Sequence, residues 1–355
     1  MITSVFKYAN PNAKIRAMKG RLLSADEFHS LLDTDTYQEF LRRLQTTSYA
    51  VDLSEKDLGE TSIPVLTNII YKSLFRDYDK TIRSIRGKIQ KFFILLYQKY
   101  ELINLKAILR GICSNVAPEE VAPLVLPTER YTLFSKEKLL EFRKVHDAVD
   151  HLQGTFFQYP LNQALRRFET EKEFFPLEMA LDLHYYHTLW DEMMKLSGEE
   201  NKIVKKILGM FVDILNVSWI IRFKEQYRFS TEEILNYTIH HGYAFKLRER
   251  RRLAESRDPA EMLAYLETTQ YGKVISRDTK LSTLQIVLHR WLVSQLQPYF
   301  LGDPFQIGVI FGYLLLKEFE VSDLITLAEA KMYAKMYGFS LEESQDYIIH
   351  VMRNT

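Results

Sequence analysis

The chain has 355 residues, of which only 13 are glycine and 10 are proline, below the usual shares of about 7% and about 5%. β-Sandwiches, barrels and propellers need turn residues every few positions, so this composition excludes them, and 46% hydrophobic with 26% charged residues excludes a disordered chain. Lys and Arg total 47 against 46 Asp and Glu, which excludes the basic field of a non-specific nucleic-acid binder but allows local basic patches. We therefore predict an all-α protein.

Helix signals follow along the chain. The apolar spacing of long amphipathic helices is found at 61–115, 177–194 and 281–296. Capping signals, a serine followed three residues later by a glutamate, occur at Ser24, Ser230 and Ser340, with a partial counterpart at Ser135.

Two short patterns recur at intervals of roughly 110 residues. The first is Leu-x-x-Thr-x-aromatic, at 44–49, 152–157 and 266–271. The second is an acid with asparagine three residues later and arginine nine residues later, as in Glu101, Asn104 and Arg110, and again in Asp213, Asn216 and Arg222. A third copy, Glu320 and Asp323, replaces the asparagine and lacks the arginine.

These repeats predict three homologous helical domains, at 1–115, 116–223 and 224–355, because the period is too long for a solenoid. On a helix the acid and the asparagine share one face, while the arginine lies on the other side. We interpret the acid and the asparagine as a buried or half-buried polar network that fixes helix register, in preference to a ligand site.

No constellation of residues favours catalysis. His184, His187 and Asp191 place three possible metal ligands along one helical face, but the aromatic neighbours Tyr185 and Trp190 favour packing, and we predict no metal site. The sequence has no phosphate loop and no nucleophile elbow. We predict a chain that is not an enzyme and holds no cofactor.

One cysteine, Cys113, excludes an intrachain disulfide and a cysteine zinc cage. The longest run without a charged or strongly polar side chain, 307–316, would rise about 15 Å as a helix, half of what a membrane span needs. The first residues lack the pattern of a signal peptide. We expect a soluble chain or one bound at a membrane surface. Within the run, Gly308 and Gly312 would allow two helices to approach closely.

A basic segment at 246–252 is the candidate contact with a partner, through Arg248, Arg250, Arg251 and Arg252. It falls where the third repeat has extra length. Nucleic acid, anionic lipid headgroups and an acidic protein face all remain possible partners, and the alternative is a solvated helical face.

The sequence also resembles a known family. The opening Tyr8-Ala-Asn10, then Lys14-x-Arg16-Ala17-Met18-Lys19-x-Arg21-Leu22-Leu23, is similar to the start of the central-stalk adaptor subunit of rotary V-type and A-type ATPases. That subunit is called d in eukaryotic enzymes and C in bacterial and archaeal ones. The stretch from Pro304 to Leu324 resembles it more strongly, and Glu101-x-x-Asn104-Leu105-Lys106-x-Ile108 resembles its first repeat.

This resemblance implies three helical domains in a pseudo-threefold funnel, with the narrow end on the cytoplasmic face of the membrane proteolipid ring and the wide mouth around the central stalk. The protein would turn with the rotor, bind neither nucleotide nor nucleic acid, and touch the membrane through the ring only. The alternative function is a helical scaffold that binds acidic partners through its arginine segment.

Overall fold

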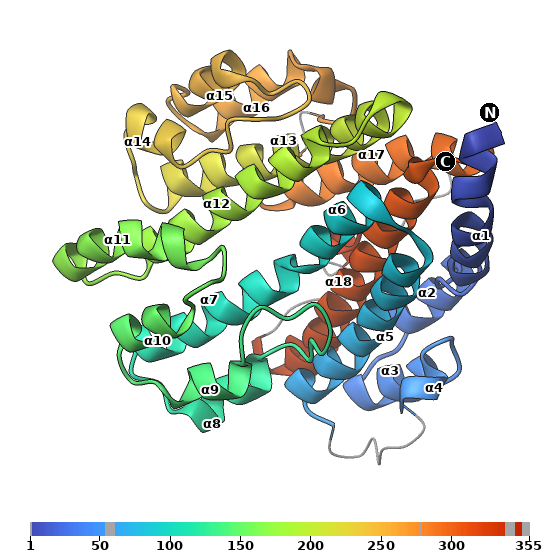
Figure 1. Cartoon of the computed structure of the whole chain (residues 1–355), viewed down its shortest axis with the longest axis horizontal. Helices are drawn as coiled ribbons and strands as arrows, with labels where there is room; N and C mark the ends of the chain where they lie inside the picture. Colours follow the sequence, from blue (N-terminus) through green and yellow to red (C-terminus); the bar gives the residue numbers. More distant parts are fainter. Residues whose placement is uncertain (1, 54–60, 277–278, 338–344, 350–355) are drawn as a thin grey trace. The chain divides into compact units, whose positions relative to one another are not determined.

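The computed structural model describes residues 2–53, 61–276, 279–337 and 345–349, and the regular elements in these ranges are all helices (Figure 1). The predicted all-α class is confirmed. The chain divides into two compact units: the first consists of Met1–Asp77 together with Ser197–Thr355, and the second of Tyr78–Leu196. The division into domains at 1–115, 116–223 and 224–355 stays a prediction, as does the pseudo-threefold funnel.

The first unit is built on three long helices that pack against one another: α13 (Gly198–Glu225), α17 (Leu281–Leu301) and α18 (Ile307–Tyr337). Helices α1 (Ile2–Lys19) and α3 (Tyr37–Leu44) pack against α18, and α15 (Leu247–Ala254) packs against α13. The other elements of this unit are α2 (Ala25–Leu32), α4 (Ala50–Leu53), most of α5 (Ile63–Ser84), α14 (Thr231–Asn236), α16 (Pro259–Glu267) and the 3₁₀ helices η3 (Gln270–Lys273) and η4 (Gln345–Tyr347).

The uncharged run 307–316 forms the start of α18, where nearly every side chain is buried. A helix that is apolar all round needs neighbours on every side, and α1, α3, α13 and α17 supply them. The two glycines permit the approach of α17. A Cβ atom on Gly308 would lie 2.5 Å from Cδ1 of Tyr299, and one on Gly312 would lie 3.2 Å from Cζ of Phe300.

The second unit centres on α6 (Gly87–Tyr97), α7 (Lys99–Cys113) and α12 (Phe175–Met194), which pack together. Shorter elements cover α7 and α12: α8 (Pro118–Val121), η2 (Ala122–Leu124), α9 (Lys136–Glu141), α10 (Val145–His151) and α11 (Gln158–Glu171). The helical stretch predicted at 61–115 is thus α5, α6 and α7 in succession. Gly87, with a positive φ of 66°, lies where α6 begins.

Predicted helix starts are found where the structure describes them. Ser24 and Ser230 each form a complete capping box with the glutamate three residues later. The Ser135 side chain accepts a hydrogen bond from the Lys138 amide at the start of α9. The signal at Ser340 lies outside the described residues.

Candidate functional site

The repeated Leu-x-x-Thr-x-aromatic pattern has the same local structure in all three copies. The leucine is fully buried near the end of a short helix. The threonine hydroxyl donates a hydrogen bond to the carbonyl oxygen of that leucine. A helix end leaves such carbonyls without an intrahelical partner, so the hydroxyl stabilises it. These bonds join Thr47 to Leu44 (2.7 Å), Thr155 to Leu152 (2.8 Å) and Thr269 to Leu266 (2.7 Å).

The acid and asparagine of α13 hold a folded-back segment of the first unit. Asn216 accepts from the amide of Ile239 (2.8 Å) and donates to the carbonyl of the same residue (2.9 Å). The Asp213 carboxylate accepts three successive amides of Tyr243–Phe245, at 3.0, 2.7 and 3.0 Å, and the hydroxyl of Tyr271 at 2.6 Å. Both side chains are inaccessible to solvent. We call this arrangement the α13 anchor.

Burial shifts the pKa of the acid in the α13 anchor. Removal from water raises the pKa of the Asp213 carboxyl, and its four donors partly offset this. The segment approaches so closely that a Cβ on Gly242, whose φ is +159°, would overlap the Asp213 carboxylate. A Cβ on Gly209 would lie 2.9 Å from the amide nitrogen of Tyr243. The anchor therefore requires glycine on both sides of the contact.

The α7 anchor in the second unit repeats this geometry. Asn104 accepts from the amide of Leu126 (2.7 Å) and donates to its carbonyl (3.0 Å). Glu101 accepts from the hydroxyl of Thr128 and from the amide of Leu133 (3.3 Å), and burial raises the pKa of its carboxyl. The aromatic residue of this copy is Phe157, which has no hydroxyl to offer, and Thr128 supplies one instead.

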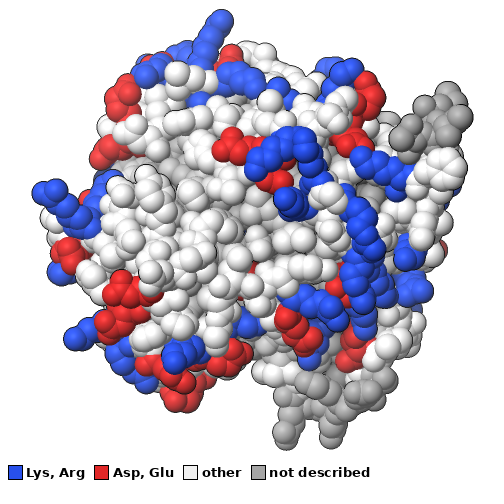
Figure 2. Space-filling model, in the orientation of Figure 1, with Lys and Arg blue, Asp and Glu red and all other residues white. Residues whose placement is uncertain are grey.

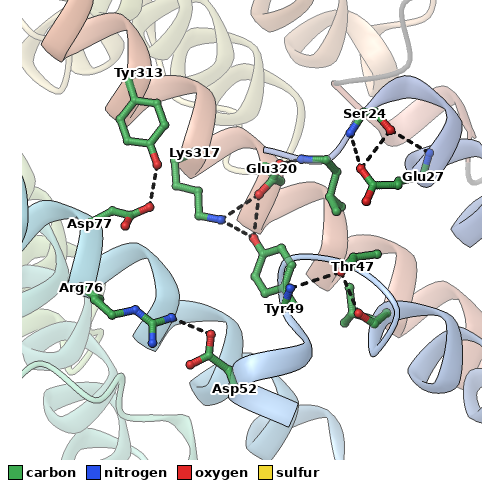
Figure 3. Close-up of polar contacts among 12 residues, drawn as sticks. Ser24, Glu27, Thr47, Tyr49, Asp52, Arg76, Asp77, Tyr313, Lys317 and Glu320 are labelled. Carbon is green, nitrogen blue, oxygen red and sulfur yellow. Dashed lines mark hydrogen bonds and ion pairs between the residues drawn. The ribbon is translucent and has the colours of Figure 1, made fainter. Parts of the chain in front are cut away.

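The α18 anchor joins distant parts of the first unit (Figure 3). Glu320 is fully buried and accepts from the amide of Leu23 (2.6 Å), the hydroxyl of Tyr49 (2.8 Å) and the ammonium group of Lys317 (2.8 Å). Lys317 also donates to the Tyr49 hydroxyl at 2.8 Å and lies 4.3 Å from the ring centroid. The buried carboxylate is thus paired and hydrogen-bonded at once, which a buried charge requires.

Asp323 occupies the position of the asparagine in the α18 anchor. It accepts from the amide of Ile349 at 2.8 Å. Asn104 binds both the amide and the carbonyl of the residue 22 positions later, and Asn216 those of the residue 23 positions later. Ile349 lies at a similar separation, 26 positions after Asp323. The amide group of an asparagine offers both a donor and an acceptor, which is how the other two anchors hold the amide and the carbonyl of one residue.

The three anchors share a buried acid and a polar residue three positions later on the same helix. In each, these two side chains bind backbone amides of segments that are distant in the sequence. In each anchor the acid and the polar residue three positions later are both buried. The arginines lie outside: Arg110 is exposed and pairs with Glu178 at 2.9 Å, and Arg222 is exposed on α13. Lys317 was not recognised from the sequence, although a lysine three residues before a helical glutamate is a usable signal.

The arginine segment forms α15, and its members have different environments. Arg250 is 2% exposed, and its guanidinium donates to the carbonyl of Ile239 and to the hydroxyl of Thr238 (3.2 Å). Burial lowers the pKa of this guanidinium. Arg250 therefore stabilises the segment that the α13 anchor holds. Because it is buried, it is not accessible to a partner, and its prediction as a contact residue is wrong.

The other three arginines are accessible. Arg251 pairs with Glu232 at 2.5 Å, and Arg252 lies 3.7 Å from Glu261. Arg248, Arg251 and Arg252 line an open groove of about 960 Å³ together with residues 268–271. Their role as a partner contact stays a prediction, and two of the three already have acidic neighbours.

The histidine pair of α12 does not form a metal centre in the described structure. The ring of His184 lies 6.0 Å from that of Phe156 and 6.1 Å from that of Tyr159, and burial lowers its pKa. Among the described residues, no group of three or more His, Cys, Asp or Glu side chains is placed to hold a metal ion.

Within the described ranges, none of the helices combines the length and the apolar character that crossing a bilayer requires. The family model described as ATP synthase (C/AC39) subunit matches residues 11–336. The chain is 27% identical to the C subunit of the A-type ATP synthase of Methanobrevibacter smithii, over 98% of this chain and 89% of that protein. It is also 27% identical to the corresponding proteins of Archaeoglobus fulgidus (98% and 99%) and Pyrococcus horikoshii (91% and 86%). The chain therefore belongs to the ATP synthase (C/AC39) subunit family.

Proposed function

We propose that this chain is a non-catalytic rotor subunit of a V/A-type ATPase, which couples the central stalk to the membrane proteolipid ring and transmits torque between them. The family match supports this, as do the relatives, which are named as the C subunit of A-type ATP synthases and match nearly the whole chain. In this proposal the chain lies at the cytoplasmic face, bound to the membrane through the ring only, and other subunits bind the nucleotide.

The recurrence of one buried anchor on three long helices is the observation that carries the proposal. A protein that passes torque between two partners must resist deformation. Close-packed interiors have low compressibility, and fully satisfied buried networks add rigidity. The α7, α13 and α18 anchors each tie a backbone segment to a helix of 15, 28 or 31 residues. A load applied to such a segment would pass directly into a long helix.

Purification of the tagged chain from detergent-solubilised membranes of its source would test the proposal, with the companions identified by mass. We expect recovery together with the proteolipid ring, stalk subunits and ATPase activity. Recovery of the chain alone from the soluble fraction, while the membranes hold an intact ATPase that lacks it, would contradict the proposal.

Coupling can be measured separately from assembly. In membrane vesicles from cells that lack the chain, we expect ATP hydrolysis without ion transport, and we expect the restored chain to recover transport. Equal transport with and without the chain would refute a role in torque transmission even if the chain co-purifies with the ATPase.

A further inference from the structure

The outward face of α1 carries a positive charge that the described part of the chain neutralises only at Lys7, which pairs with Glu200 at 2.5 Å. Residues 1–25 contain five Lys or Arg residues and no Asp or Glu. Within the first unit this is a stretch of one sign in a chain whose total charge is +1. Figure 1 draws α1 on the right-hand side of the view, and Figure 2 shows Lys and Arg side chains on that side with some Asp and Glu among them.

The opposite face of α1 is fixed in the first unit. Tyr8, Ile15 and Met18 are buried, and the helix packs against α18. Asn12 donates from its side chain to the carbonyl of Gln306 at 3.0 Å. The apolar face of this helix is therefore already used by the fold, and only its polar face remains available to a partner.

The available face combines small and cationic side chains. The small ones are exposed and spaced four residues apart, at Ala9, Ala13 and Ala17. Beside them the side chains of Lys14 and Arg16 are exposed, and Arg21 is exposed two residues after the helix ends. None of the three forms an ion pair with a described residue. Alanines allow a second helix to approach to the short end of the usual 8–10 Å range, which brings its acidic side chains within reach of the flanking cations.

The arginine segment of α15 is less suited to an acidic partner. Arg250 is buried, while Arg251 and Arg252 lie beside Glu232 and Glu261. A partner at α15 would have to compete with these carboxylates, whereas a partner at the 14–21 stretch would not. An acidic partner of the first unit is thus better placed on α1 than on the segment that stands out in the sequence.

A membrane surface fits α1 poorly. Helices that lie in a lipid interface bury an apolar face in it, and the apolar face of α1 is turned into the protein. Phe6, which is 84% exposed, is the large apolar side chain that α1 presents outward among its described residues. We propose that the outer face of α1 docks an acidic helix of another subunit of the rotary complex. This inference rests on the proposed function.

The test is a double charge reversal in the full chain, Lys14→Glu with Arg16→Glu, matched by Lys205→Glu with Lys206→Glu. The control pair is exposed on α13 of the same unit, has no ion pair with a described residue and makes the same change in charge. Tagged chains are recovered from solubilised membranes at low salt, and the ATPase subunits bound per chain are counted. Like charges across a contact are strongly unfavourable, so we expect about tenfold fewer bound subunits for the α1 variant and wild-type recovery for the control.

A second measurement does not depend on the stability of that variant. A photo-crosslinking amino acid replaces Ala13 in the assembled complex, and we expect its adduct on a helical segment rich in Asp and Glu. Equal recovery of K14E/R16E and wild type, or an adduct on lipid or on a basic segment, would overturn the inference while leaving the proposed function intact. Loss of binding to phosphatidylglycerol vesicles with unchanged subunit recovery would also overturn it, in favour of a membrane contact. Failure of wild type itself to bring down the ATPase would refute the proposed function, and the inference with it.

Discussion

The Asp213 carboxylate is the acceptor on which the α13 anchor depends, and its removal gives a sharp measure of what an anchor contributes. In D213A the amides of Tyr243–Phe245 and the hydroxyl of Tyr271 lose their acceptor in a buried site. Each buried donor left unsatisfied costs about 1–3 kcal/mol. Because the four donors share one site and the segment can relax, their costs do not add in full. We expect a loss of about 4 kcal/mol in unfolding free energy.

The conservative substitution D213N separates geometry from charge. One carboxylate oxygen accepts three of the four donors, and the asparagine oxygen can take that place, while its amino group would face the amide of Tyr243. We expect a loss of about 2 kcal/mol, the cost of one buried donor and of the weaker acceptor.

Amide hydrogen exchange of the full chain is the assay, because it reports the held segment directly. A loss of about 4 kcal/mol lowers the protection of the amides at 243–245 by about 10³-fold, and one of about 2 kcal/mol by about 30-fold. Asp26→Ala in α2 is the control, since Asp26 is exposed in the same unit and a surface substitution is expected within about 0.5 kcal/mol. Unchanged protection at 243–245 in D213A would refute the reasoning.

Three further predictions concern other parts of the fold. Gly308→Ala would push a Cβ against the ring of Tyr299 and should lower stability by about 1–3 kcal/mol, measured by urea denaturation; an unchanged midpoint would show that α17 can shift freely. Tyr49→Phe removes a hydroxyl from buried Glu320 and should cost about 1–2 kcal/mol, whereas a neutral result would mean that another donor replaces it. Burial raises the pKa of Glu101 in the folded state, so the folded chain binds this proton more tightly than the unfolded chain does. The unfolding free energy should therefore fall as the pH rises from the ordinary pKa of a glutamate, near 4.3, to the raised pKa of the folded state. E101Q should lack this slope, and parallel pH profiles of the two proteins would contradict the assignment.

Much of the local structure could be predicted because it depends on short spacing. The capping boxes at Ser24 and Ser230, the helices of the 61–115 stretch and the all-α class follow from periodicity and from turn-residue content. The shared face of Glu101 and Asn104 follows from three-residue spacing on a helix. These inferences need only the geometry of one element.

What could not be predicted depends on tertiary partners. The repeats show that Tyr49 and Glu320 belong to recurring patterns, but a recurrence does not tell which copy of one pattern pairs with which copy of the other. Arg250 lies in a run of charges that is typical of a solvated face, and its burial follows from carbonyl groups that only the folded segment at 238–240 presents. The two compact units likewise follow from packing, which repeat boundaries do not specify.

The α18 anchor has a consequence for how the chain is made. Tyr49 is 271 residues before Glu320, and Leu23 is 297 residues before it. At a synthesis rate of about 5–20 residues per second, the N-terminal helices leave the ribosome roughly 15–60 s before the helix that completes their contacts exists. During that interval the apolar faces of α1 and α3, which end up against α18, have no native cover. The packing of the first unit therefore cannot be completed until the last of its long helices has been made.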